Sequence, residues 1–295
     1  MAFLTPNFTG FIIFISLPVI ASLLLSFTEW DPVGQKISEI KWVGLHNFIQ
    51  LVGFHWEQGH VVANDPDFWR FCWNTVFLML ATPISMAGSL FLAIVLNQKL
   101  RGMVLFRTVF FIPSIAAGVG TLILWIWVFN PEYGPLNTAL RFFGVDGPDW
   151  LRSYEWAKPA LMLMTVWTVI GGTNMVLYLA GLQNIQPELH EAATIDGAGA
   201  WQQFRHITWP MLTPVTFFIF TMSIIRGFQG GFRAAYIMTN GGPAGATTTI
   251  SFYIYNQGFR YFNMGYAAAI AWVLFVIVLV ITMVNWRFGE RKVSY

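Results

Sequence analysis

Two short patterns in the chain contain the residue types of a metal or nucleotide site, and each of them lacks a necessary member. The stretch His190–Thr194 begins like the zinc-protease pattern H-E-x-x-H, but Thr194 stands where the second histidine ligand is required. Gly197–Gly199 lacks the third glycine of a dinucleotide fingerprint, and no Gly-Lys pair is present for a phosphate-binding loop. The single cysteine, Cys72, excludes an intrachain disulfide and a multi-thiolate zinc site. We therefore predict a chain that is not an enzyme and that holds no metal or cofactor of its own.

Polar residues also recur at helical spacing inside long apolar runs. Such stripes are Trp167, Gly171, Asn174 and Tyr178; Thr75, Thr82, Ser85 and Ser89; and Thr216, Ser223, Arg226 and Gly230. For the Ser and Thr stripe we favour helix packing. For Asn174, Tyr178 and Arg226, packing and ligand binding are equally good interpretations, because amide, phenol and guanidinium groups bind hydroxyls or anions. The candidate residues along a substrate pathway are Asn174, Tyr178, Arg226 and Gln229.

The composition places these stripes in a membrane. Only 10% of the 295 residues are charged and 56% are hydrophobic, against roughly 25% and 45 to 50% in soluble globular chains. A water-soluble surface cannot be built from so few charges. The formal net charge of +2 is too small to indicate a protein that binds nucleic acid. The sequence therefore predicts a polytopic membrane protein.

Six apolar runs are long enough to cross a bilayer as helices, which takes about 20 residues each. They cover approximately residues 2–27, 71–96, 109–129, 160–182, 211–232 and 266–286, and Arg226 is the only charge within them. The first run lacks a basic start and a cleavage site, so we expect it to remain as a span. Strands of a membrane barrel would be shorter and alternate in polarity. The expected fold is all-α, with one transmembrane domain over residues 1–295.

The distribution of Lys and Arg predicts the orientation of the spans. Segments on the side of the two termini carry seven basic residues in 48, and the opposite segments carry eight in 106. The first set is Lys99, Arg101, Arg107, Arg205, Arg287, Arg291 and Lys292. Because cytoplasmic loops are enriched in Lys and Arg, both termini are expected in the cytoplasm.

The loop over residues 183–210 contains the pattern of a short helix. Pro187 suits a first helical position, and Glu188 and Glu191 suit the positive end of the helix dipole. A small apolar surface follows, and Asp196-Gly197 should end the helix. We predict a second helix over residues 201–208 that stops before Pro210. These features fit a helix that docks into a partner, and they fit an ordinary connecting loop equally well.

The residues of this loop also resemble a known family motif. The matching positions, at fixed spacing, are Glu191-Ala192-Ala193, Asp196-Gly197-Ala198, Phe204, Ile207, Pro210 and Pro214. They resemble the EAA loop of ABC importer permeases. Residues 42–48, 111–113, 124–125 and 239–243 are similar to segments of the carbohydrate branch of that family, so the resemblance covers nearly the whole chain.

This resemblance implies a function and a set of partners. In the family, the EAA helix sits in a groove of a cytoplasmic ATPase subunit, so the implied coupling site is Glu191, Ala192, Ala193, Asp196, Gly197 and Pro210. The implied fold is the type I importer permease in a bacterial inner membrane. The implied partners are a second homologous permease, a homodimeric ATPase that binds ATP and Mg²⁺, and an extracytoplasmic substrate-binding protein. The implied substrate is a di- or oligosaccharide or a polyol.

One departure from the family pattern leaves the substrate open. Carbohydrate permeases usually carry an acidic or amide residue after the phenylalanine before the T-x-G-G-P loop, whereas Phe232 is followed by Arg233. With Arg226 nearby, this charge suits an anion such as glycerol phosphate, and residues 290–295 also resemble permeases of that kind. Interfacial anchoring explains Arg233 as well.

Two other classes of membrane protein remain as alternatives. An ion-coupled secondary transporter needs an ionisable residue near mid-membrane, and only Arg226 is available. An intramembrane enzyme needs a His, Asp or Glu cluster within the spans, which the six runs do not contain.

Overall fold

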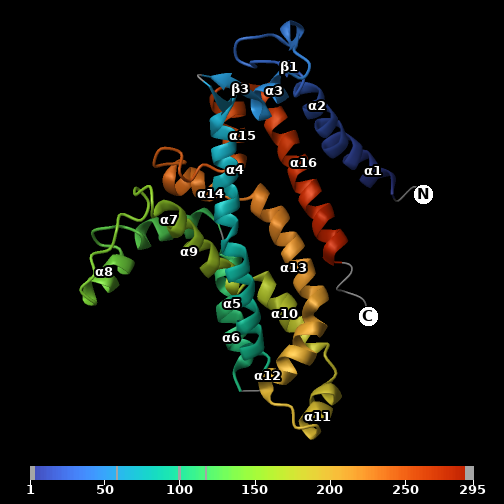
Figure 1. Cartoon of the computed structure of the whole chain (residues 1–295), viewed down its shortest axis with the longest axis vertical. Coiled ribbons are helices and arrows are strands. Elements are labelled where there is room, and N and C mark those ends of the chain that lie inside the picture. The colour runs from blue at the N-terminus through green and yellow to red at the C-terminus, as the bar shows by residue number, and fades with distance from the viewer. Residues whose placement is uncertain (1–3, 58, 99–100, 117, 290–295) are drawn as a thin grey trace. The chain divides into compact units, whose positions relative to one another are not determined.

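The computed structural model describes residues 4–57, 59–98, 101–116 and 118–289, and most of them lie in helices (Figure 1). The chain folds into two compact units. The first comprises the described residues of Met1–Thr75 and Thr248–Leu279, and the second those of Val76–Thr247 and from Val280 onward. Ala2 and Phe3 at the expected start of the first span, and the basic residues Lys99, Arg291 and Lys292, lie outside the described residues.

The first unit begins with a helix that contains a π-helical turn. Its elements are α1 (Thr5–Phe11), η1 (Ile12–Ser16) and α2 (Leu17–Leu25). Pro18 lies two residues after the end of the π-helical turn, and the Leu17 amide bonds to the Ile12 carbonyl five residues back. Because proline has no N–H to donate, a turn with one extra residue lets the helix continue across it.

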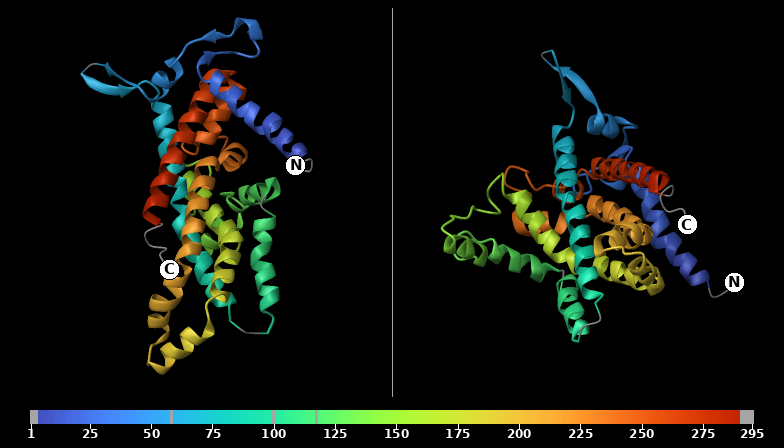
Figure 2. Two further views of the ribbon diagram at one scale, coloured as in Figure 1. Left: turned by 90° about the vertical axis from the view of Figure 1, so that its right-hand side faces the viewer. Right: turned by 60° about the horizontal axis from the view of Figure 1, so that its bottom comes forward.

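Two small antiparallel sheets follow α2, and the sequence analysis missed them. β1 (Thr28–Glu29) pairs with β2 (Lys41–Trp42), and β3 (Phe54–Glu57) pairs with β4 (His60–Ala63). The 3₁₀ turn η2 (Ile37–Glu39) lies between β1 and β2, and α3 (His46–Val52) lies between the two sheets. The β3–β4 hairpin extends away from the helices of its unit (Figure 2). Strands of two to four residues are too short to show an alternating pattern, and the all-α class stands with these additions.

Hydrogen bonds and close packing join these elements to one another and to the C-terminal part of the same unit, where the Met264 amide donates to the Trp30 carbonyl at 3.1 Å. That part comprises α15 (Ile250–Tyr255), η5 (Asn256–Arg260) and the start of α16 (Met264–Gly289). The Asn47 amide donates to the carbonyls of Ser26 and Thr28, at 3.0 and 2.9 Å. A Cβ on Gly265 would lie 1.8 Å from the Thr28 carbonyl oxygen, so only glycine permits this approach.

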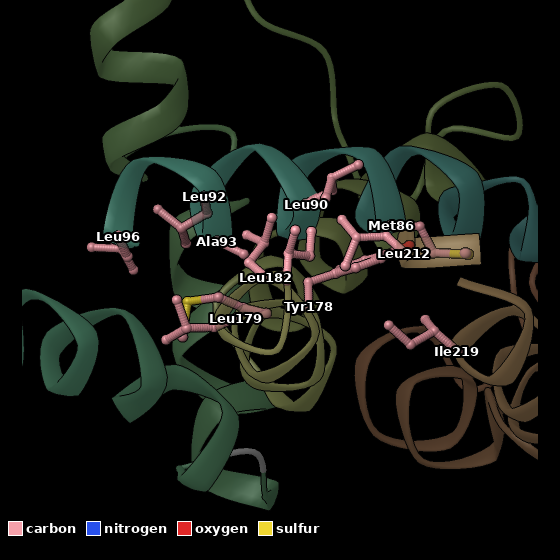
Figure 3. Close-up of a cluster of buried hydrophobic side chains, with 12 residues drawn as sticks. Met86, Leu90, Leu92, Ala93, Leu96, Tyr178, Leu179, Leu182, Leu212 and Ile219 are labelled. Atoms are coloured by element: carbon pink, nitrogen blue, oxygen red, sulfur yellow. The ribbon is translucent and has the colours of Figure 1, made fainter. Parts of the chain in front are cut away.

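The second unit is a helical bundle around a core shared by three helices. Met86, Leu90, Ala93 and Leu96 of α5 pack with Tyr178, Leu179 and Leu182 of α10 and with Leu212 and Ile219 of α13 (Figure 3). Its helices are α5 (Ala81–Leu96), α6 (Met103–Ile115), α7 (Val119–Val128), α8 (Pro135–Phe142), α9 (Ala157–Ile170), α10 (Thr173–Gln183), α11 (Pro187–Ile195), α12 (Ala200–Gln203), η3 (Phe204–Thr208), α13 (Trp209–Gln229), α14 (Phe232–Ala234) and η4 (Ala235–Thr239). A second core cluster includes Leu122, Trp125, Leu161, Met164 and Met238. The Ser and Thr stripe of α5 faces other helices: Ser85 and Ser89 are buried, and Ser89 lies 3.5 Å from the Val169 carbonyl.

Several expected spans are built from more than one helix. Among the described residues, five helical stretches are long and apolar enough to cross a membrane, namely Thr5–Leu25, Pro66–Leu96, Ala157–Gln183, Ala200–Thr239 and Met264–Arg287. The second of these comprises α4 (Pro66–Met79) and α5. The expected run 109–129 falls on the pair α6 and α7, whose axes differ by 95°. The run 160–182 is interrupted at Gly171, where a Cβ would lie 2.0 Å from the Phe110 carbonyl oxygen.

The prediction that a helix stops before Pro210 is wrong. α12, η3 and α13 form one continuous helix from Ala200 to Gln229. The π-helical turn η3 precedes Pro210, and the Trp209 amide bonds to the Phe204 carbonyl. As at Pro18, the extra residue in the turn accommodates the missing proline N–H.

Candidate functional site

The 183–210 loop forms an elbow, defined here as Pro187–Gln203, which lies at the end of the second unit below α10 and α13 (Figure 1). Pro187 is a first-turn residue of α11, and Glu188 lies in the acid-favouring first turn. The helix ends at Ile195, as the Asp-Gly pair predicts. α11 contains no buried residue, and Ile195 is 87% exposed.

The turn after α11 requires a glycine because of its backbone angle and not because a larger side chain would clash. Gly197 has φ +82°, and a Cβ there would meet nothing within 4 Å. The Gly197 amide donates to the Thr194 carbonyl at 3.0 Å, and the Ala198 amide donates to the Ala193 carbonyl at 2.8 Å. This pair of bonds is a Schellman cap, which satisfies two carbonyls at the end of α11.

The structure brings some of the expected coupling residues together and leaves others apart. Ala193, Asp196 and Gly197 line a hollow of about 390 Å³ with Gln202, Gln203, His206 and Ile207. Glu191 and Ala192 are exposed on α11 and do not line that hollow. Pro210 lies beyond the elbow, exposed at the start of α13.

One residue that the sequence analysis missed ties the two arms of the elbow together. Gln203 of α12 donates from Nε2 to Thr194 Oγ1 and to the Ala198 carbonyl, both at 3.0 Å. Its Oε1 lies 3.2 Å from Nδ1 of His190. Gln203 is not a position of the motif that we matched, so no signal in the sequence singled it out. Trp201, which is 69% exposed, stacks on Phe204 beside it.

The four expected pathway residues do not converge. Asn174 and Tyr178 of α10 are 9% and 1% exposed, and Tyr178 belongs to the core shared by α5, α10 and α13 (Figure 3). Arg226 and Gln229 lie near the end of α13 and are exposed. The stripe that joined Trp167 to Tyr178 assumed one helix, and the break at Gly171 interrupts it.

Gln229 lines a hollow of the second unit that combines hydroxyl, amide and guanidinium groups. The hollow measures about 520 Å³ and lies between α9 and the residues that follow α13. Its polar side chains are Thr121, Thr165, Thr168, Gln229 and Arg233. The hydroxyl groups of Thr165 and Thr168 donate to carbonyls one turn back in α9, which leaves oxygen lone pairs available as acceptors. The volume is in the range of small-ligand sites.

The first unit contains a separate, more acidic hollow of about 830 Å³. Its lining includes the carboxylates of Glu29, Asp31, Asp65 and Asp67, and its lining residues include no Lys or Arg. Tyr253 donates its hydroxyl to Asp65 Oδ2 at 2.7 Å, and Tyr266 donates to the same oxygen. Burial, together with the bond to the Asp65 carboxylate, raises the pKa of Tyr253 above the ordinary tyrosine value.

Comparison with known proteins identifies the family. The model of the family described as "Binding-protein-dependent transport system inner membrane component" matches residues 85–291. The probable ABC transporter permease protein YesP of Bacillus subtilis is 37% identical over all of this chain and 91% of its own length. The arabinooligosaccharides transport system permease protein AraP of B. subtilis is 33% identical, over 96% of this chain and 86% of its own. The sn-glycerol-3-phosphate transport system permease protein UgpA of Yersinia pestis is 34% identical, over 96% and 91%.

A solved structure supports the same fold. A bacterial ABC transporter involved in the import of the acidic polysaccharide alginate contains a chain that superposes with a TM-score of 0.83. The match covers 99% of this chain and 95% of that one, at 24% sequence identity. The family resemblance carried by Glu191–Pro214 is therefore confirmed. The chain belongs to the family of binding-protein-dependent ABC importer permeases, and it is a multi-pass transport subunit of the inner membrane rather than an enzyme.

Proposed function

We propose that this chain is one of two related permease subunits that together enclose the pathway of an ABC importer for a carbohydrate, a di- or oligosaccharide or a polyol. A homodimeric ATPase, which binds ATP and Mg²⁺, docks at the elbow, and an extracytoplasmic binding protein delivers the substrate. The chain forms one transmembrane domain with six spans and has both termini in the cytoplasm. ATP-driven closure of the ATPase then changes the side of the membrane to which the pathway is open.

The observation that carries the coupling role is the construction of the elbow. α11 has no buried residue and keeps most of its side chains exposed to a partner, and a glycine-dependent cap fixes where it ends. α12 continues without interruption into the span α13. A partner that moves α11 therefore has a helical connection into the membrane. We assign ATPase coupling to Glu191, Ala192, Ala193, Asp196, Gly197 and Pro210.

The side chains that line the two hollows favour a neutral, hydroxyl-rich substrate. The hollow beside Gln229 offers three threonine hydroxyls and an amide, which suit the hydroxyl groups of a sugar. The hollow of the first unit disfavours anions, because its lining carries the carboxylates of Glu29, Asp31 and Asp65, whereas that of Asp67 is paired with Arg70 at 3.0 Å. Arabinooligosaccharide transport by the relative AraP agrees with a neutral substrate. We retain Arg226 and Gln229 as pathway residues, whereas the burial of Asn174 and Tyr178 favours a packing role.

A glycerol phosphate is the second candidate, and Arg233 is the observation that favours it. The Arg233 guanidinium lines the same hollow as Gln229, and guanidinium groups bind phosphate well. The relative UgpA transports glycerol 3-phosphate.

The two substrates are separated by reconstitution. The chain is co-purified with its partner permease and ATPase, placed in proteoliposomes with the cognate binding protein, and supplied with internal ATP. We expect ATP-dependent uptake of a labelled arabino-oligosaccharide, unaffected by excess glycerol 3-phosphate. Uptake of glycerol 3-phosphate instead would establish the second candidate. Uptake that follows an ion gradient without ATP would overturn the importer assignment.

A further inference from the structure

The side chain of Gln203 connects both sides of the turn at Gly197. Its two amide hydrogens go to Thr194 Oγ1 in α11 and to the Ala198 carbonyl in the turn, each at 3.0 Å. Its oxygen faces His190 Nδ1, one turn earlier on α11, at 3.2 Å. A primary amide has two donors and one acceptor atom, so all of its polar atoms are engaged in the elbow.

These bonds matter because apolar packing does little to hold α11. The helix has no buried residue, and Leu189 and Ile195 are both exposed. The Schellman cap fixes how α11 ends, but it joins α11 only to the turn and not to α12. Gln203 makes the direct link, since it belongs to α12 and reaches two side chains of α11.

We propose that Gln203 is the positioning residue that makes the two arms of the elbow move as one body, so that displacement of α11 by the ATPase reaches α13. The inference rests on the coupling role proposed for the elbow. α12 passes through η3 into α13 without a break, so a link at Gln203 is sufficient to carry motion from α11 into the span. Without it, α11 turns about Gly197 and its motion is lost in the turn.

The neighbouring glutamine provides a matched control. Gln202 accepts a hydrogen bond from the Gly199 amide at 2.8 Å, so its side chain bonds at the start of its own helix, whereas that of Gln203 reaches α11. Its side chain is exposed, so water can replace it at the amide. Gln202→Leu and Gln203→Leu therefore make the same chemical change one residue apart, and only the second cuts the link.

The experiment measures substrate imported per ATP hydrolysed in the reconstituted transporter. We expect Gln203→Leu to lower this ratio about tenfold, the effect of losing one to two neutral hydrogen bonds, while the ATPase still co-purifies and hydrolyses ATP. Gln202→Leu should lower the ratio much less than Gln203→Leu does. A wild-type ratio in Gln203→Leu overturns the inference, and so does loss of the ATPase from that variant, because it shows a role in docking or folding.

A second pair of variants separates the bond from the shape of the side chain. Thr194→Val removes the hydroxyl that Gln203 contacts but keeps the branched shape, whereas Thr194→Ser keeps the hydroxyl. We expect Val to lower the ratio and Ser to restore it. Equal ratios in the two variants contradict the inference. If the ATPase fails to co-purify even with the wild-type chain, the proposed coupling function fails, and that result is distinct from a failure at Gln203 alone.

Discussion

Replacement of Gly197 tests whether the cap of α11 controls ATPase docking. Gly197 has φ +82°, a conformation that costs most residues roughly 1–2 kcal/mol. Because a Cβ there meets nothing within 4 Å, Gly197→Ala changes only this backbone preference. Since 1–2 kcal/mol corresponds to a factor of about 5–30, the affinity of the permease complex for the ATPase should fall within that range.

Other substitutions at this position should follow the same backbone preference. Gly197→Asn should have a smaller effect, because asparagine tolerates positive φ better than alanine. Gly197→Pro should have the largest effect, because proline fixes φ near −65° and removes the amide that bonds to the Thr194 carbonyl. The protein should still insert, since no span is altered. ATPase binding to the detergent-solubilised permease complex gives the affinity, and uptake in proteoliposomes gives the functional loss.

Gly199 supplies the control. It has φ −71° and ψ 167°, which any residue can adopt, and a Cβ there would meet only Gln202 Oε1 at 3.9 Å. Gly199→Ala should bind the ATPase as the wild type does. Equal losses in the two alanine variants, or normal binding by Gly197→Pro, would refute the argument from the backbone angle.

Three further predictions concern other parts of the chain. Gly265→Ala places a Cβ 1.8 Å from the Thr28 carbonyl oxygen, so the thermal midpoint in detergent should fall by several degrees; an unchanged midpoint contradicts this packing. The raised pKa of Tyr253 means that the folded protein holds this proton more tightly than the unfolded chain, so its stabilisation is complete below about pH 10 and declines as the pH rises above that value. Tyr253→Phe removes the bond to Asp65 and should flatten the decline in midpoint between pH 9 and 11 relative to the wild type. Gln229→Ala should raise the substrate concentration for half-maximal uptake about tenfold without changing the midpoint, because an exposed amide is lost from the hollow; an unchanged concentration would remove Gln229 from the pathway.

The membrane class and the family were accessible from sequence because both rest on local, repeated signals. Long uncharged runs indicate membrane spans wherever they occur in the chain, and the motif at Glu191–Pro214 is a pattern of fixed spacings. The end of α11 could also be predicted from a local signal, because Asp196-Gly197 is a strong helix stop. The short strands β1–β4 were missed because their pairing depends on contacts across the chain rather than on periodicity.

The errors arose where helix geometry departs from the regular α-helix. A proline normally ends a helix, and the sequence gives no sign of the π-helical turn that carries the chain past Pro210. The stripe from Trp167 to Tyr178 assumed an unbroken helix, and the interruption at Gly171 comes from close contact with Phe110, which is distant in sequence. Gln203 was missed because its importance lies in three partners that only the folded turn brings within reach.

The continuous helix from Ala200 to Gln229 has a mechanical consequence. At 1.5 Å per residue it measures about 45 Å, so a tilt of about 5° about one end displaces the other by about 4 Å. The helix therefore acts as a lever arm that amplifies a small rotation, and its two ends are the elbow and the hollow beside Gln229. A shift of about 4 Å exceeds the length of a hydrogen bond, so a modest rotation at one end is enough to make or break contacts with a ligand at the other.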